Sequence, residues 1–369
     1  MKNETLYVLM QPEARNSYWA DNIRDGIRDG AREWQDAICA IDFSGIVPDL
    51  DGKHVLVVGN NGGWLEAAVA QLVCRRAHPI IVNACMLPVR QYRCSGVVFE
   101  LEEMLGHCLE LLAAAGRRRC ALLGVHSDSV TDHVKADAFM KAAADFRPED
   151  IIWAPGRLDD CVEAFAADFE SSGCDAAICA NDTVAVSLIR HLTERGFVLP
   201  DSLYIIGMGN SYIGAGLRLP LTSVMFDYRE MGATAVRLYH NLRQSRSACH
   251  MTVSLPCRLI VRDSAPLSDI TLPPPMPPTV IPPQRNYFDS DEVQNIIRVE
   301  AMLQAVDAID REILFGLARD ESCDAIAERL FFSGRAVRYR LTNLVRHWNF
   351  ENRAALENAI KRAVQAGRE

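Results

Sequence analysis

The sequence lacks most of the features that mark an enzyme, a metal protein or a membrane protein. No apolar run approaches the roughly 18 residues that a membrane helix needs. Its 12 cysteines include no C-x-x-C pair and no Cys/His cluster at zinc spacing, which favours buried or idle thiols in a reducing compartment. No Ser-His-Asp arrangement and no paired carboxylate motif stands out. We therefore expect no enzymatic activity, no metal, no cofactor and no membrane partner.

The N-terminal region also lacks the features of a secretion signal. The apolar run Leu6–Met10 is too short for the core of a signal peptide, and no small-residue cleavage site follows it. We therefore expect a cytoplasmic protein.

The charge is acidic overall but basic in one place. A net charge of −9 argues weakly against a nucleic acid covering the whole surface. Between Arg329 and Arg346 there is no Asp or Glu, and this stretch holds five arginines. Such a local basic block favours a nucleic-acid contact in this part of the chain.

Residues 1–265 alternate short apolar runs with helical stretches. This alternation predicts an α/β fold whose parallel sheets are covered by helices on both faces. At 369 residues the chain is too long for a single core, so we expect two such sheets in a two-lobed domain. Lobe one is expected at about 1–95 and 226–248, and lobe two at about 96–225 and 249–265. A ligand site is expected where the carboxyl ends of the strands face each other across a cleft. The segment Asn60–Trp64 lacks the spacing of a phosphate loop and is interpreted as a turn.

Residues 266–288 are predicted to form a linker. Eight of the chain's 17 prolines lie between Pro266 and Pro283, which favours an extended, semi-rigid spacer. Residues 289–369 then follow a purely helical pattern and form a small all-helical domain.

A helix-turn-helix is predicted at about 309–346. Ser322 and Ser333 each precede a helix that their hydroxyls can cap. On the second helix the apolar residues Val337, Leu341, Leu344, Val345 and Trp348 share one stripe, while polar residues occupy the opposite face. Arginine suits guanine edges or phosphates, asparagine suits adenine, and threonine suits a thymine methyl. An ordinary solvated basic helix remains the alternative. The candidate DNA-binding residues are Arg335, Arg338, Tyr339, Thr342, Asn343 and Arg346.

This segment resembles the LuxR/response-regulator type of helix-turn-helix, on the stretches Ile309–Leu314, Leu317–Ser322, Ala325–Ser333 and Asn352–Leu356. The resemblance implies that Arg338, Tyr339 and Thr342 contact bases, and that the helix Arg353–Val364 pairs subunits. Asp320 replaces the turn glycine of that family. Cys323 and Asp324 replace polar or basic residues, which puts phosphate contacts from the first helix in doubt.

Residues 1–265 resemble the ligand-binding region of the lactose/galactose repressor family, on the stretches Asn16–Trp19, Ala177–Ala185, Pro220–Val224 and Leu259–Ser264. The sequence departs from that family's pattern in two places. His133 replaces an arginine, and Gly207–Asn210 replaces the motif G-x-D-D. The ligand therefore stays open between a sugar-like and a nucleoside-like molecule. The resemblance implies a ligand wall of Tyr18, Trp19, His133, Asn181 or Asp182, and Phe226. Five of these residues have a structural alternative: core packing for Tyr18 and Trp19, an exposed position for His133, and a turn or helix cap for Asn181 and Asp182.

These features together predict a ligand-responsive transcription regulator that binds double-stranded DNA and a small-molecule effector as a homodimer. The DNA-binding module follows the sensor, whereas it precedes the sensor in the lactose repressor family. We hypothesise that closure of the lobes reaches the DNA-binding heads through the linker and the helix 289–306. The alternatives are a cytoplasmic sensor whose helical tail binds a protein, and a solute-binding protein.

Overall fold

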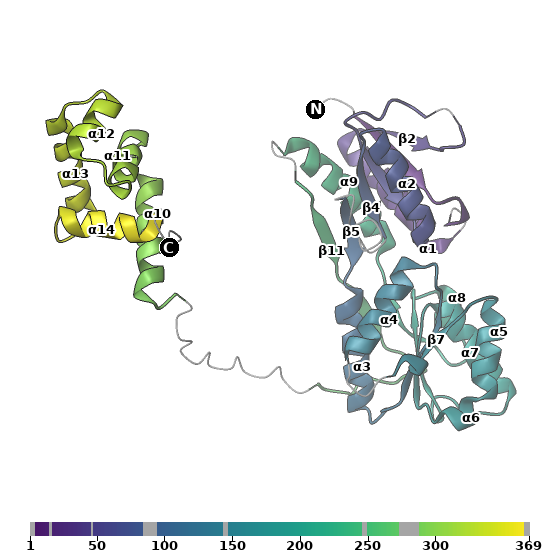
Figure 1. Cartoon of the computed structure of the whole chain (residues 1–369). Coiled ribbons are helices and arrows are strands. Elements are labelled where there is room, and N and C mark those ends of the chain that lie inside the picture. Colours follow the sequence, from purple (N-terminus) through teal and green to yellow (C-terminus); the bar gives the residue numbers. More distant parts are fainter. Residues whose placement is uncertain are drawn as a thin grey trace. The chain divides into compact units, whose positions relative to one another are not determined.

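The computed structural model describes residues 4–14, 17–45, 47–83, 94–142, 147–245, 249–272 and 288–364. The chain divides into two compact units, Met1–Pro273 and Pro274–Glu369. The first unit is α/β and the second is all-helical (Figure 1). The predicted fold class is confirmed.

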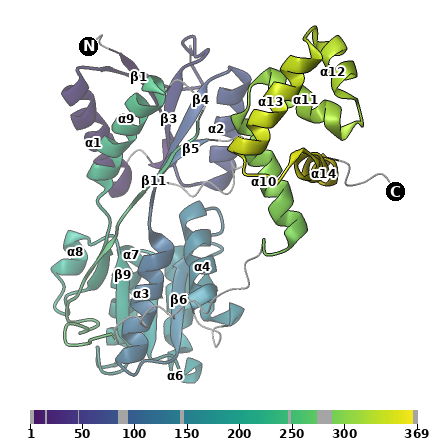
Figure 2. The ribbon, with the colours of Figure 1, turned by 90° about the vertical axis from the view of Figure 1, so that its left-hand side faces the viewer.

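Lobe one of the first unit is built on a six-stranded, wholly parallel sheet in the order β11-β5-β4-β3-β1-β2. Helices α1 (Tyr18–Trp34) and α9 (Tyr228–Gln244) lie side by side, while α2 (Gly62–Cys74) packs in a separate buried cluster (Figure 2). Glycines allow α1 and α9 to approach closely, because a Cβ on Gly26 would lie 1.9 Å from the Arg229 carbonyl oxygen. The strands are β1 (Thr5–Met10), β2 (Ala37–Ile41), β3 (His54–Val58), β4 (His78–Val82), β5 (Ser95–Phe99) and β11 (Thr252–Leu255).

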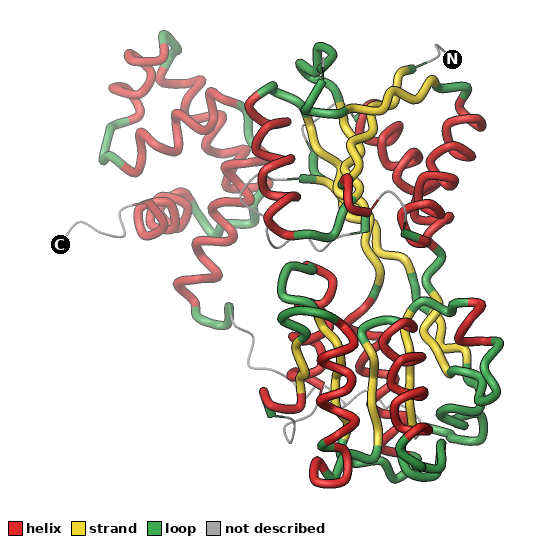
Figure 3. The backbone as a smooth tube through the Cα atoms, turned by 90° about the vertical axis from the view of Figure 1, so that its right-hand side faces the viewer, coloured by secondary structure: helices red, strands yellow, loops and turns green. Residues whose placement is uncertain are grey.

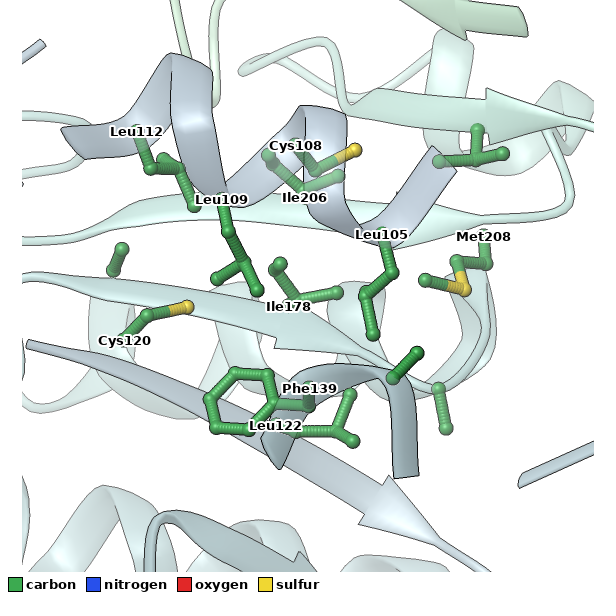
Figure 4. Packing of buried hydrophobic residues seen from close by; sticks show 14 of the residues in the cluster. Leu105, Cys108, Leu109, Leu112, Cys120, Leu122, Phe139, Ile178, Ile206 and Met208 are labelled. Carbon is green, nitrogen blue, oxygen red and sulfur yellow. The ribbon is translucent and has the colours of Figure 1, made fainter. Parts of the chain in front are cut away.

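Lobe two repeats this plan with the strand order β12-β10-β9-β8-β6-β7, in which only β12 runs antiparallel to its neighbour. Leucines of α3 (Leu101–Ala114) and Phe139 of α4 (Val130–Ala142) pack against opposing strand residues such as Ile178 (Figure 4). The other face carries α5 (Leu158–Ala167) and α7 (Asp182–Glu194), with the short α6 (Phe169–Ser172) and α8 (Tyr212–Ala215). The strands are β6 (Cys120–Val125), β7 (Ile151–Trp153), β8 (Ala176–Cys179), β9 (Tyr204–Met208), β10 (Thr222–Met225) and β12 (Arg258–Ile260).

The chain passes between the lobes three times, after β5, after β10 and after β11 (Figure 3). The predicted lobe boundaries at 95/96 and 248/249 were therefore wrong, because β5 and β11 both belong to the sheet of lobe one. Strand β11 alternates between exposed and half-buried residues at the edge of that sheet, and so it lacks the continuous apolar run used to recognise strands.

The predicted linker 266–288 also begins too early. Leu267 is buried, and Ile270 and Leu272 pack against the same cluster of lobe two, so this stretch is part of the first unit. Residues 273–287, which contain most of the predicted spacer, lie outside the described residues.

The second unit contains five described helices around one apolar cluster. Val337, Leu341 and Leu344 are buried in this cluster and Val345 and Trp348 are partly buried, as the predicted stripe requires. Ser322 accepts a hydrogen bond from the Ala325 amide and Ser333 accepts one from the Ala336 amide, which confirms both predicted caps. The helices are α10 (Asp291–Ala305), α11 (Ala308–Ala318), α12 (Cys323–Leu330), α13 (Gly334–His347) and α14 (Arg353–Val364).

Candidate ligand cleft and nucleic-acid interface

A cavity of about 380 Å³ lies between the two lobes of the first unit. Its walls come from the carboxyl ends of β1, β3 and β4 in lobe one and of β6, β8 and β9 in lobe two, as expected for parallel sheets. The residues that line it are Gln11, Trp19, Asn60, Asn61, Asn83, Phe99, Leu101, His126, Asp128, Ser129, Thr131, Asp132, Lys135, Ala180, Asn181, Met208, Phe226 and Tyr228.

One wall of the cavity is aromatic. The ring centroid of Phe99 lies 5.1 Å from that of Phe226 and 5.4 Å from that of Tyr228, and the latter two rings are 5.7 Å apart. Burial raises the pKa of the Tyr228 hydroxyl well above its usual range, so this group stays protonated. With Trp19, these rings offer flat apolar faces of the kind that sugars and nucleobases stack on.

The opposite wall contains a buried ion pair. The Lys135 ammonium lies 2.6 Å from a carboxylate oxygen of Asp132 and also donates to the Ala180 carbonyl oxygen at 2.8 Å. The second Asp132 oxygen accepts the backbone N–H of His126. The charges of Asp132 and Lys135 compensate each other within the wall, whereas Asp128, which also lines the cavity, has no cationic partner within the described residues.

Side-chain amides supply the remaining polar groups. The Gln11 carbonyl oxygen accepts the backbone N–H groups of Asn60 and Asn61. The Asn61 and Asn181 oxygens cap α2 and α7, respectively. Within the described residues no protein partner takes the NH₂ groups of Gln11, Asn61 or Asn181, so these groups can donate to a neutral polar ligand.

Three of the six predicted ligand residues line this cavity: Trp19, Asn181 and Phe226. Tyr18 does not, because it begins α1 with its side chain 56% exposed. The predicted place of His133 was wrong. It lies within α4, exposed, where its ring contacts the Ser127 carbonyl oxygen and Trp153 instead of the cavity.

Asp182 has a structural role. It is buried behind the cavity wall, and its carboxylate accepts hydrogen bonds from the Ser223 hydroxyl at 2.6 Å and from the Ser211 backbone N–H at 2.5 Å. The Ser223 hydroxyl oxygen in turn accepts the Asn210 backbone N–H. Asp182 therefore fixes the loop after β9, and the helix-cap alternative applies to its neighbour Asn181.

Sequence reasoning missed the ion pair and most of the amides. The spacing D-x-x-K, Asp132 to Lys135, places both side chains on one face of α4, whereas His133 points about 100° away from Asp132. Asn60 and Asn61, interpreted as part of a turn, also line the cavity. Their position directly after a buried strand was the signal that could have identified them.

The second unit exposes the predicted DNA-binding surface. Each of the six candidate residues of α13 is exposed, while the opposite face of the helix is buried in the cluster around Leu341. These residues are Arg335, Arg338, Tyr339, Thr342, Asn343 and Arg346.

Some arginines of the basic stretch 329–346 are already paired with acidic side chains. Arg340 forms ion pairs with Asp307 and Asp310, both at 2.9 Å, and Arg329 pairs with Glu312 and Glu321. Arg338 is 3.3 Å from Asp324, in an exposed pair of the kind that adds little stability. Arg335 and Arg346 have no acidic partner within the described residues, so they carry the available positive charge.

Two other kinds of site are absent from the described part of the chain. None of its helices has the length and hydropathy to span a bilayer. No group of three or more His, Cys, Asp or Glu side chains there is arranged to bind a metal ion.

The two sheets and the cavity between them define a two-lobed, periplasmic-binding-protein-like fold. A family model described as a periplasmic binding protein-like domain matches residues 109–265. The catabolite control protein A of Priestia megaterium is 23% identical over 277 residues, which covers 71% of this chain and 82% of that protein.

Solved structures agree on the fold. The cellobiose complex of the transcriptional regulator CelR matches with a TM-score of 0.59 and 17% identity, covering 72% of this chain and 85% of that one. The transcription regulator CcpA of Lactococcus lactis matches with a TM-score of 0.57 and 19% identity, over 72% of this chain and 100% of that one. Both of these solved proteins are transcription regulators.

Proposed function

We propose that this protein is a cytoplasmic transcription regulator, without enzymatic activity, in which an effector bound between the lobes modulates DNA binding by α12 and α13. The observation that carries the DNA-binding part is the division of α13 into two faces. One face is buried in the helical core and the other exposes Arg335, Asn343 and Arg346. A helix seated in this way can enter a major groove without unfolding. The sequence resemblance of this segment to the LuxR-type helix-turn-helix supports the same proposal.

The effector is proposed to be a neutral, polar molecule of sugar or nucleoside size. A cavity of about 380 Å³ is within the usual range for small-molecule sites, which begins at about 300 Å³. Amide donors on the walls suit hydroxyl or ring acceptors, and the aromatic wall suits a flat face. Because Lys135 is already paired with Asp132, a strongly anionic ligand has no free cation to bind within the described cavity wall.

The protein is proposed to act as a homodimer, with two copies of α13 presented to the two halves of a symmetric operator. The proposal therefore makes a specific prediction about the preferred DNA. Duplexes selected by the full chain should contain an inverted repeat.

The test is selection of duplexes from a random pool by the full chain, followed by fluorescence anisotropy over a range of salt concentrations. The logarithm of affinity should fall linearly with the logarithm of salt. Arg335→Ala and Arg346→Ala should each reduce the slope by about 1 for every DNA phosphate that the arginine neutralises in each subunit. Arg118→Ala, which removes an exposed charge from lobe two, is the matched control and should leave the slope unchanged.

The same experiment separates the alternatives. If no duplex is enriched while the chain remains folded, the helical unit is better explained as a surface for a protein partner. If affinity is retained in both α13 variants, then DNA is bound by another part of the chain.

A further inference from the structure

The two lobes are joined by backbone hydrogen bonds at a point far from the three crossing segments. The Gly62 N–H donates to the Asp128 carbonyl oxygen at 2.9 Å, and the Val130 N–H donates to the Asn60 carbonyl oxygen at 2.8 Å. Between them, Asn61 and Ser129 form an isolated antiparallel bridge. We call residues 60–62 and 128–130 together the latch.

Each half of the latch is held firmly in its own lobe. In lobe one, the buried Gln11 side chain accepts the N–H groups of Asn60 and Asn61, and the Asn61 side chain caps α2. In lobe two, the Ser129 hydroxyl oxygen accepts the Asp132 N–H at the start of α4. The latch therefore opens by separation of the lobes rather than by local loosening of either half.

A side chain reinforces the backbone bonds. Val130 starts α4 in lobe two, yet its side chain is 4% exposed and belongs to the apolar cluster of lobe one, with Val57 and Leu65. Its Cγ2 atom would lie 3.5 Å from a Cβ placed on Gly62. Opening the latch withdraws this valine from an apolar cluster, which water opposes.

The topology places the latch at the mouth of the cleft. In lobe one the chain crosses from β5 and β11, at one edge of the sheet, whereas Asn60 follows β3 nearer the other edge. In lobe two the chain crosses next to β10 and β12, at one edge of the sheet. Asp128 follows β6, which lies nearer the opposite edge. Asn60, Asn61, Asp128 and Ser129 all line the cavity as well.

We propose that the latch holds the two lobes together without an effector, and that it must open for the cleft to widen. Each hydrogen bond contributes on the order of a five-fold change in the closing equilibrium, so the latch is reversible. That the cleft is the site of an effector rests on the proposed function, whereas the joining of the lobes by the latch does not.

Gly62→Pro tests the latch with little other disturbance. Gly62 is the first residue of α2, where proline is well tolerated, and Asn61 before it is already extended, with φ −78° and ψ 122°. The substitution deletes one donor across the cleft. Gly62→Ala is the matched control, because it keeps that donor and its Cβ lies at an ordinary contact distance from Val130.

The measurement is hydrogen–deuterium exchange of the full, ligand-free chain at the Val130 amide. In Gly62→Pro this amide should exchange about five-fold faster than in the unmodified chain, and in Gly62→Ala at the unmodified rate. Amides of α7 should be unchanged in both, which reports an intact lobe two. Equal Val130 exchange in all three proteins would overturn the proposal, as would faster exchange in Gly62→Ala alone.

A second variant tests the valine separately. Val130→Thr keeps the N–H donor but places a hydroxyl in the apolar cluster of lobe one, so the Gly62 amide should exchange faster. An unchanged rate would contradict the role given to Val130. Because neither DNA nor effector is present, failure of the latch and failure of DNA binding are observed independently.

Discussion

Asp132 and Lys135 are the residues that most change the interpretation of the ligand cleft. Neither residue was among those predicted to line the ligand site. The structure instead places a compensated ion pair in the wall, with side-chain exposures of 11% and 9%. Removing one member leaves the other charge buried and unpaired, which costs far more than the pair itself contributes.

Lys135→Met should therefore destabilise the sensor by about 3 kcal/mol or more, because Asp132 loses its counter-charge. Adding Asp132→Asn should restore much of that loss, since the asparagine can remain neutral in the same place. Urea unfolding of the three proteins measures both effects. A double variant as unstable as Lys135→Met would show that the loss comes from packing and not from charge.

His54 gives lobe one a pH dependence. Burial lowers the pKa of His54 to about 4 from 6.5, and the nearby charges of His78 and Arg243 add to this effect. As the pH falls, the unfolded chain binds a proton at His54 at a higher pH than the folded chain does. The contribution of His54 to the free energy of unfolding is therefore fully present above about pH 6.5, and it is lost as the pH falls toward 4.

The urea midpoint should consequently fall between pH 7 and pH 5, and His54→Gln should reduce this fall. If the urea midpoint of His54→Gln falls as much as that of the unmodified chain, the pH dependence comes from other groups.

At the scale of elements, long periodic segments were predicted well, whereas the short strands β5 and β11 were missed. The helix predicted at Arg353–Val364 has those bounds in the structure, and both serine caps of the helix-turn-helix are present. Strand β5 was missed because its five residues include Gly96 and depend on pairing with β4 and β11. Such non-local pairing leaves little trace in the local sequence.

The turn between α12 and α13 contains an unusual residue. Phe331 adopts the left-handed conformation, with φ 59°, and its side chain is 97% exposed. An L-residue in this conformation costs about 1 kcal/mol relative to glycine, and the ring offsets little of that cost because it packs on almost nothing.

Phe331→Gly should therefore stabilise the helical unit by about 1 kcal/mol, whereas Phe331→Ala, which keeps the Cβ, should stay within about 0.5 kcal/mol of the unmodified chain. Thermal unfolding followed by circular dichroism distinguishes the two. Equal stability of both variants would mean that the backbone at this position is not strained.

At the scale of the whole molecule, the two units explain how one chain can couple an effector to DNA. The first unit supplies the cleft between its two lobes, and the second supplies the exposed face of α13. Coupling requires that the effector bind the closed and open forms with different affinities, and that these forms bind DNA differently. The proline-rich route proposed for this coupling includes residues 273–287, which lie outside the described part of the chain.

The central claim is that occupation of the cleft changes DNA affinity. The most direct measurement is the affinity of the full chain for its selected duplex, with and without a sugar or nucleoside that raises its melting temperature. The account predicts a change of at least about five-fold, in either direction, which Trp19→Ala should abolish at the same compound concentration. Equal affinity at saturating compound would contradict it.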